Sequence, residues 1–236
     1  MRPHRLTASR ALLLALALAV TSRATAARAE DFRIEPLKDA PPATLAAPVR
    51  ESLHAEGFRV LDDKGKVYAE LWLRKVTPAS EKPGGPKGTV QFPFLGEGEL
   101  LGALRFPGEG RDNRDQSITK GVYTLRYGLQ PVNGDHLGVS PYRDYALLLP
   151  AAKDTALAAV ARKPLEERSS ESAGTSHPAI WLLSTPPVSV TSAPAMAHDE
   201  EKNTWGAVVP LSLEVKGASG VTSLNIQLIV NGVLGG

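Results

Sequence analysis

The sequence contains no cysteine among its 236 residues. Disulfide bonds, iron–sulfur clusters, thiolate nucleophiles, cysteine zinc sites and thioether-linked haem are therefore excluded. A lipid anchor on an amino-terminal cysteine is excluded for the same reason. The apolar run near the amino terminus, Ala11 to Val20, has about ten residues, roughly half of what a membrane-spanning helix needs.

Residues 1–29 have the pattern of a cleavable signal peptide. Three arginines precede the apolar run, and small residues follow it, among which Ala27 and Ala29 offer a cleavage site before Glu30. Cleavage after Ala29 would leave no membrane span, so we expect a periplasmic or extracellular protein. The alternative is an uncleaved amphipathic or membrane-inserted terminus.

Cleavage also changes the charge of the protein. It removes five arginines and no acid, so 22 basic residues remain against 25 acidic ones, a net charge of −3. The basic isoelectric point of the whole chain therefore gives no reason to expect binding to nucleic acid or to an anionic membrane. Without disulfides, the remaining residues, about 207 of them, must be stabilised by a hydrophobic core, and a chain of this size can form one.

The mature chain divides into a leader and one domain. Residues 30–55 are rich in proline and alanine and predict an extended or flexible arm. Residues 56–236 form the expected domain. Within it, residues 152–174 predict an insertion of one or two helices, because Asp154 can cap a first helix, Pro164 can open a second and Gly174 can end it.

Alternating apolar and polar residues predict strands through most of this domain. A turn at Asp62-Asp63-Lys64-Gly65 separates two apolar segments and predicts a hairpin. The expected strands are Phe58–Leu61, Lys66–Lys75, Thr89–Phe94, Glu99–Phe106, Val122–Gln130, Asp144–Leu149, Ala179–Ser184, Trp205–Val215 and Leu224–Val230. So many strands with short connections and one helical insertion predict a mainly β fold, an antiparallel β-sandwich.

A loop between two of these strands, Pro131 to Tyr142, is longer than a turn requires, and extra loop length often carries function. The candidate ligand-binding residues in and just after it are Asp135, His136, Tyr142, Arg143 and Asp144. Arg143 could hold a carboxylate or phosphate with two hydrogen bonds. Turn chemistry favours another interpretation, in which the acids bind loop amides and Arg143 holds the loop down.

Catalytic and metal-binding patterns are weak in this chain. Ser140, His136 and a nearby acid have the residue types of a serine hydrolase, but no Gly-x-Ser-x-Gly turn is present. Met196 and His198 could suit copper, yet the chain has no His-x-His pair and no cysteine to complete such a site. We therefore expect no cofactor.

Two further segments have competing interpretations. Asp112-Asn113-Arg114-Asp115 has acids spaced as in a calcium loop but lacks its glycine and terminal glutamate, which favours a surface ion-pair segment. Tyr68 and Trp72 share one face of a strand, where they could form a platform for a sugar ring or a partner, or could pack inside the protein.

Five stretches in the central half of the chain carry a resemblance to other proteins. They run from Ala69 to Arg74, from Gly121 to Pro131, from Asp135 to Gly138, from Tyr142 to Pro150 and from Gly174 to Pro178. There the chain resembles a group of exported bacterial proteins of uncharacterised function. The resemblance brings no reaction, cofactor or catalytic residue, and it implies only an exported bacterial domain.

These observations favour a non-enzymatic, exported β-sandwich that binds a small molecule or another envelope protein through the loop after Pro131. The alternative is an envelope hydrolase or a metal-dependent enzyme in which His136 acts as the acid–base group or as a ligand.

Overall fold

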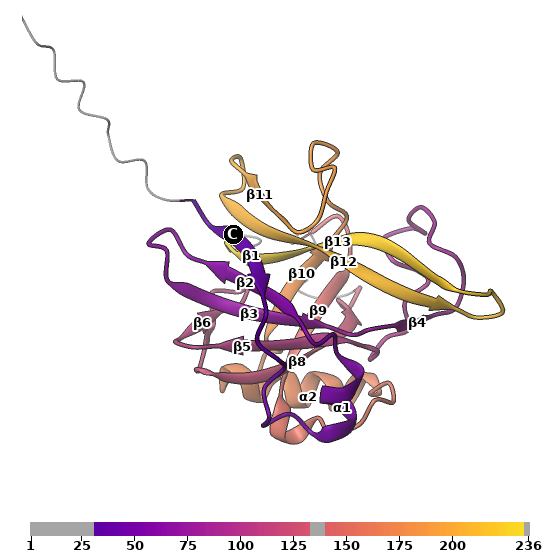
Figure 1. Cartoon of the computed structure of the whole chain (residues 1–236), viewed down its shortest axis with the longest axis horizontal. Coiled ribbons are helices and arrows are strands. Elements are labelled where there is room, and N and C mark those ends of the chain that lie inside the picture. The colour runs from indigo at the N-terminus through magenta and orange to yellow at the C-terminus, as the bar shows by residue number, and fades with distance from the viewer. Residues whose placement is uncertain (1–30, 133–139, 234–236) are drawn as a thin grey trace, which may run out of the picture.

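The structure, a computed structural model, describes residues 31–132 and 140–233. It is mainly β, with 43% strand and 11% helix. One large sheet curls around the main hydrophobic core (Figure 1). In the order in which they lie side by side, its strands are β1 (Arg33–Leu37), β2 (Gly57–Leu61), β3 (Val67–Leu73), β5 (Leu100–Phe106), β8 (Gly121–Leu129), β9 (Asp144–Pro150), β10 (Ile180–Ser184), β13 (Val221–Asn231), β12 (Thr204–Val215) and β11 (Ala195–Asp199).

The mainly β prediction is confirmed, but the antiparallel sandwich is not. A further strand, β4 (Thr77–Ala79), pairs in parallel with β12, so the sheet is mixed. The bend between its two halves lies at β10, which pairs with β9 through Ile180–Leu182 and with β13 through Leu183–Ser184. A single strand thus serves both halves, where a sandwich would have two separate sheets.

The predicted hairpin between β2 and β3 is confirmed. Asp62 Oδ1 accepts hydrogen bonds from the backbone N–H groups of Lys64 and Lys66, at 2.9 and 2.8 Å. Gly65 has a φ of 73°, a left-handed conformation that glycine adopts without steric cost. The turn residues thus fix the register of the two strands.

The residues of the predicted leader contribute to the fold. β1 pairs with β2 at one end of the sheet, and α1 (Ala47–Ser52) follows it. Phe32, just before β1, lies 5.9 Å from the ring of Trp205 on β12, measured between ring centroids, so the two ends of the sheet approach each other. The curl encloses large side chains such as Tyr127 and Trp181, which have no exposed surface.

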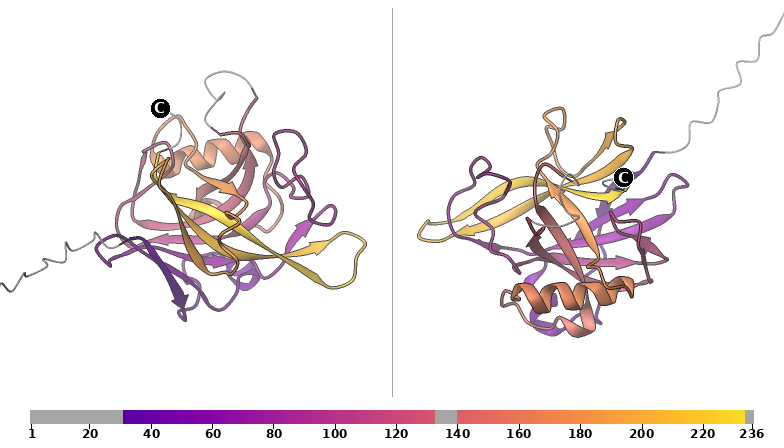
Figure 2. Two further views of the ribbon diagram at one scale, coloured as in Figure 1. Left: turned by 90° about the horizontal axis from the view of Figure 1, so that it is seen from above. Right: turned by 180° about the vertical axis from the view of Figure 1, so that it is seen from behind.

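Helices cover part of the outer side of the sheet (Figure 2). α2 (Arg162–Ala173) packs on β9, where Tyr145, Leu147 and Leu149 form a cluster with Leu165 of the helix. A short helical turn, η2 (Ala151–Lys153), lies between β9 and α2. β9 is therefore buried on both faces, which explains why its sequence is almost continuously apolar.

The aromatic residues of β3 pack inside the protein. Trp72 is 1% exposed and its indole N–H donates to the carbonyl oxygen of Asp39 at 2.8 Å. Tyr68 contacts the rings of Phe32 and Phe106. Trp72 is therefore not available to an exposed platform, and Tyr68 is half-buried among other rings.

Asp154 does not begin a helix but follows η2 as its C-cap residue. It pairs with Arg126 of β8 at 2.6 Å, and both side chains are buried, so the residues up to Ala161 are held by this pair in a non-helical path. α2 begins only at Arg162, and Gly174 ends it with a φ of 63°, as predicted.

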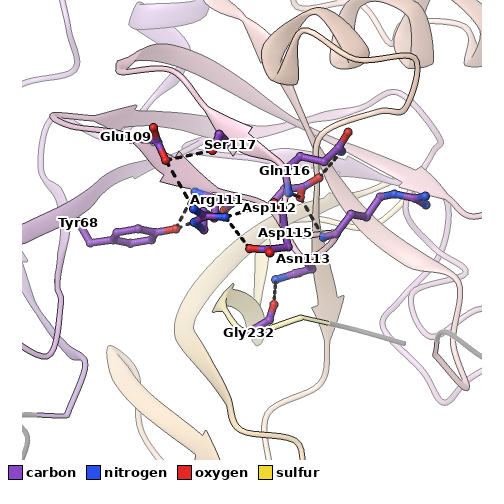
Figure 3. Close-up of polar contacts among 10 residues, drawn as sticks. Tyr68, Glu109, Arg111, Asp112, Asn113, Asp115, Gln116, Ser117 and Gly232 are labelled. Atoms are coloured by element: carbon purple, nitrogen blue, oxygen red, sulfur yellow. Dashed lines mark hydrogen bonds and ion pairs between the residues drawn. The ribbon is translucent and has the colours of Figure 1, made fainter. Parts of the chain in front are cut away.

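The Asp112–Asp115 segment is not a surface ion-pair segment. It connects two short paired strands, β6 (Gly110–Arg111) and β7 (Ser117–Ile118). Asp112 and Asn113 are 3% and 2% exposed. The Asp112 carboxylate accepts hydrogen bonds from the backbone and the side chain of Gln116 (Figure 3). Only the exposed pair of Arg111 and Asp115 fits the prediction, with a distance of 2.6 Å between their charged atoms.

Candidate functional site

The predicted site lies only partly within the described residues. Asp135 and His136 lie outside the described residues. The structure therefore does not test an enzyme that depends on His136. Tyr142, Arg143 and Asp144 are described, and they have different environments.

Asp144 is fully buried at the start of β9, and its carboxylate accepts three hydrogen bonds. The donors are the backbone N–H groups of Gln91 and Phe92, at 2.7 and 2.9 Å, and the hydroxyl of Tyr127, at 2.7 Å. Burial, together with the neighbouring charge of Asp144, raises the pKa of Tyr127 far above its ordinary value, so this hydroxyl stays protonated and donates. Asp144 thus fixes the backbone of residues 91 and 92.

Arg143 closes the base of the long loop. Its Nε donates to the carbonyl oxygen of Gln130 at 2.6 Å, and its backbone N–H donates to that of Thr89 at 2.9 Å. The carbonyl oxygen of Arg143 accepts from the backbone N–H of Gln130 at 2.8 Å. These contacts are of the kind expected if Arg143 holds the loop down.

Tyr142 lines a cleft with a volume of about 230 Å³, here called the Gln91 cleft. The cleft lies at β10, where the sheet bends, and its walls come from β10 to β13 and from the loops that carry Gln91 and Tyr142. Its lining residues are Gln91, Ser140, Pro141, Tyr142, Leu182, Leu183, Ser184, Pro187, Ala197, Asp199, Lys202, Thr204, Gln227 and Ile229.

The side chain of Gln91 is the unusual group in this cleft. The residue is 7% exposed, and its Nε2 donates to the hydroxyl of Thr185 at 2.8 Å. Its Oε1 is buried and has no hydrogen-bond partner among the described residues. A buried acceptor without a donor costs about 1–3 kcal/mol. A ligand with an N–H or O–H group could remove this cost.

A second amide, that of Gln227, lies in the same cleft. Gln227 is 7% exposed, and its Oε1 accepts a hydrogen bond from the hydroxyl of Ser184 at 3.2 Å. The side chain lies against the backbone of Gly206, where a Cβ atom would be only 2.1 Å from Nε2 of Gln227. Glycine at position 206 therefore leaves room for this amide.

The charges at the rim of the cleft compensate each other. Lys202 Nζ and Asp199 Oδ2 are 3.1 Å apart, and the backbone N–H of Lys202 donates to Asp199 Oδ1 at 3.1 Å. These contacts, the backbone hydrogen bond first, lower the pKa of Asp199, so its carboxylate is ionised at neutral pH. The cleft thus presents amides and hydroxyls with little net charge, a surface suited to a neutral polar molecule.

Residues 31–132 and 140–233 contain no group of three or more His, Asp or Glu side chains that could hold a metal ion. His198, the residue considered for copper, stacks on the ring of Trp205 with the centroids 4.0 Å apart. Nor does any helix within these residues have the length and apolar character to cross a membrane.

Sequence reasoning identified Tyr142 but missed Gln91. The Thr89–Phe94 segment was predicted as a strand, but it is irregular, because the Asp144 carboxylate takes two of its backbone N–H groups. Gln227 gave a partial signal, as a polar residue on the outward face of an otherwise apolar strand. No family model, no curated protein and no solved structure matches the chain.

Proposed function

We propose that the chain is an exported, non-enzymatic domain that binds a small neutral polar molecule in the Gln91 cleft. The observation that carries the proposal is the buried Oε1 atom of Gln91, which lacks a donor within the described part of the chain. A ligand hydroxyl or amide N–H would satisfy it. The amide of Gln227 and the hydroxyls of Tyr142 and Thr204 supply further hydrogen-bonding groups around the same space.

Preorganisation supports a binding role for this cleft. Asp144 fixes the backbone of Gln91, and Thr185 holds the nitrogen of its side-chain amide. The group that would contact the ligand therefore loses little conformational freedom on binding, which favours affinity. In this proposal Asp144 is a positioning residue that acts through Gln91.

The test is mass spectrometry of small molecules that co-purify with the native protein. Three proteins should be compared: the wild type, Gln91→Met, which removes the acceptor at similar volume, and Asn225→Met, a matched amide replacement outside the cleft. We expect a neutral polar compound with the wild type and with Asn225→Met. Its amount should fall roughly tenfold or more with Gln91→Met, because a buried hydrogen bond of about 1.4 kcal/mol or more is lost.

Equal amounts of the compound in all three proteins would refute the role of Gln91. Should nothing co-purify, thermal denaturation with a panel of monosaccharides and N-acetylated amino acid amides provides the second measurement. No stabilisation of the wild type by any member of that panel would overturn the proposal.

Export is part of this proposal and has its own measurement. The intact mass of the protein purified from cells should correspond to a chain that begins near Glu30. An envelope fraction that contains the chain with Met1 intact would contradict cleavage.

A further inference from the structure

A second cavity, here called the Arg114 pocket, lies at the edge of the α2 layer and shares no lining residue with the Gln91 cleft. Its volume is about 60 Å³. Much of its lining is apolar and comes from the ends of β8, β9 and β10. These apolar or aromatic residues are Leu129, Pro131, Tyr145, Leu147, Pro178 and Ile180.

Arg114 supplies a positive charge at this pocket. The residue is exposed, and its guanidinium makes no hydrogen bond or ion pair with any residue in the described ranges. Burial raises the pKa of Tyr145 in the pocket lining to about 12, and the charge of Arg114 acts in the opposite direction. Arg114 lines the same pocket as the apolar side chains, so its positive charge lies beside an apolar surface.

The backbone that carries Arg114 is held firmly. Its N–H donates to Asp112 Oδ1 at 2.9 Å. The side chain of the neighbouring Asn113 donates to the carbonyl oxygen of Gly232 at 3.1 Å (Figure 3). It also donates to that of Ile229 at 3.0 Å and accepts from the backbone N–H of Leu182 at 2.6 Å. Arg114 thus extends from a loop that is fixed to two strands.

Glu166 of α2 is the other charged residue that lines the pocket, and it forms an ion pair. Its carboxylate lies 3.6 Å from Nε of Arg162, which also pairs with Glu97 at 3.0 Å. Glu166 is therefore partly compensated, whereas Arg114 has no such partner among the described residues. Gln130 and His177 complete the polar part of the lining.

We propose that the Arg114 pocket binds a small molecule in which a carboxylate is joined to a short apolar chain. The guanidinium of Arg114 would hold the carboxylate through paired N–H donors, while the chain lies on Leu147 and Ile180. An engineered apolar cavity of about 150 Å³ accommodates benzene, so a volume near 60 Å³ suits a chain of a few carbons and not a ring. Fatty acids and amino acids both provide this chemistry.

Butyrate is the probe, and NMR of the Leu and Ile methyl groups is the measurement. We expect saturable shifts of the Leu147 and Ile180 methyl signals, with a dissociation constant on the order of 1 mM for so small a ligand. Arg114→Gln should weaken binding by about fivefold or more. Lys163→Gln, which removes a charge from an exposed α2 residue outside the pocket, should not change it.

Two compounds of similar length test the carboxylate. Butanol and butylammonium should bind more weakly than butyrate to the wild type. Equal affinity for all three, or equal butyrate affinity of the wild type and Arg114→Gln, would overturn the proposal. L-2-aminobutyrate separates the two ligand sources: tighter binding than butyrate indicates an amino acid whose ammonium group meets Glu166, and weaker or equal binding indicates a simple acid.

The two proposals can fail separately. Gln91→Met should leave butyrate binding unchanged, because Gln91 does not line the Arg114 pocket. Loss of butyrate shifts in a folded Gln91→Met protein would show that the pocket is not independent of the cleft and would contradict a separate binding site at Arg114.

Discussion

Replacing Arg126 should destabilise the protein severely, because its guanidinium is a fully bonded charge in the interior. Arg126 has no exposed surface, and the side chain of Asp154 is 1% exposed. The guanidinium makes five hydrogen bonds, to both carboxylate oxygens of Asp154 and to the carbonyl oxygens of Gly98, Ala156 and Ala158. All the donors of the side chain are therefore used.

The expected magnitude follows from what Arg126→Met leaves behind. An unpaired buried carboxylate costs about 3–5 kcal/mol, which is a large part of the 5–15 kcal/mol that stabilises a typical domain. Thr124 Oγ1 would still donate to Asp154, at 2.5 Å, but it carries no charge to compensate the carboxylate. The free energy of unfolding in urea measures this loss.

The controls separate the buried pair from charge in general. Lys153→Met breaks a pair whose side chains are 58% and 43% exposed, so it should cost no more than about 1 kcal/mol. The double variant Arg126→Met/Asp154→Leu should be more stable than Arg126→Met, because no buried charge is left alone. If Arg126→Met does not fold, Arg126→Lys, which keeps the charge with fewer donors, replaces it. Equal stability of the Arg126 and Lys153 variants would refute the reasoning.

Three further changes have defined outcomes. Asp144→Ala should lower the free energy of unfolding in urea by about 3–6 kcal/mol, since it leaves three buried donors without an acceptor. Tyr127→Phe should lower it by about 1–2 kcal/mol. Equal losses for the two variants would contradict the role of Asp144. Burial raises the pKa of Tyr68 and Tyr145 from 10.0 to about 12. The contribution of these hydroxyls to stability is therefore complete below pH 10 and is lost between pH 10 and 12. Ultraviolet titration measures tyrosine ionisation, and ionisation of all tyrosines near pH 10 would disprove this prediction. Gly98→Ala should lower the melting temperature by several degrees, because φ is 84° and a Cβ atom would lie 2.0 Å from a backbone oxygen; an unchanged value would count against that geometry.

Features that depend on neighbouring residues could be predicted from the sequence. The Asp62–Gly65 turn and the glycine that ends α2 are examples, because turn and cap residues act within a few positions of the chain. Alternation also located most strands. It could not show how they assemble, since the bend of the sheet arises from the split pairing of β10 with β9 and β13.

Features that depend on distant partners could not be predicted. Asp154 has the sequence context of a helix cap, yet Arg126, 28 positions earlier, takes its carboxylate. The strand expected at Thr89–Phe94 is prevented by Asp144, more than 50 positions away. The same dependence hides the candidate sites, because an unpartnered amide at Gln91 or guanidinium at Arg114 is recognisable only once the surrounding fold is known.

The divided pairing of β10 also bears on how the protein opens. Only Leu183 and Ser184 join it to β13, while β12 and β13 pair along ten positions. The pair of strands β12 and β13, here called the carboxyl-terminal ribbon, should therefore detach from β10 as a cooperative unit. In hydrogen exchange, its amide protons should exchange before those of the remaining strands. A molecule seated between Gln91 on one side of this junction and Gln227 on the other would bridge it, so occupancy of the cleft should slow hydrogen exchange in the ribbon more than elsewhere.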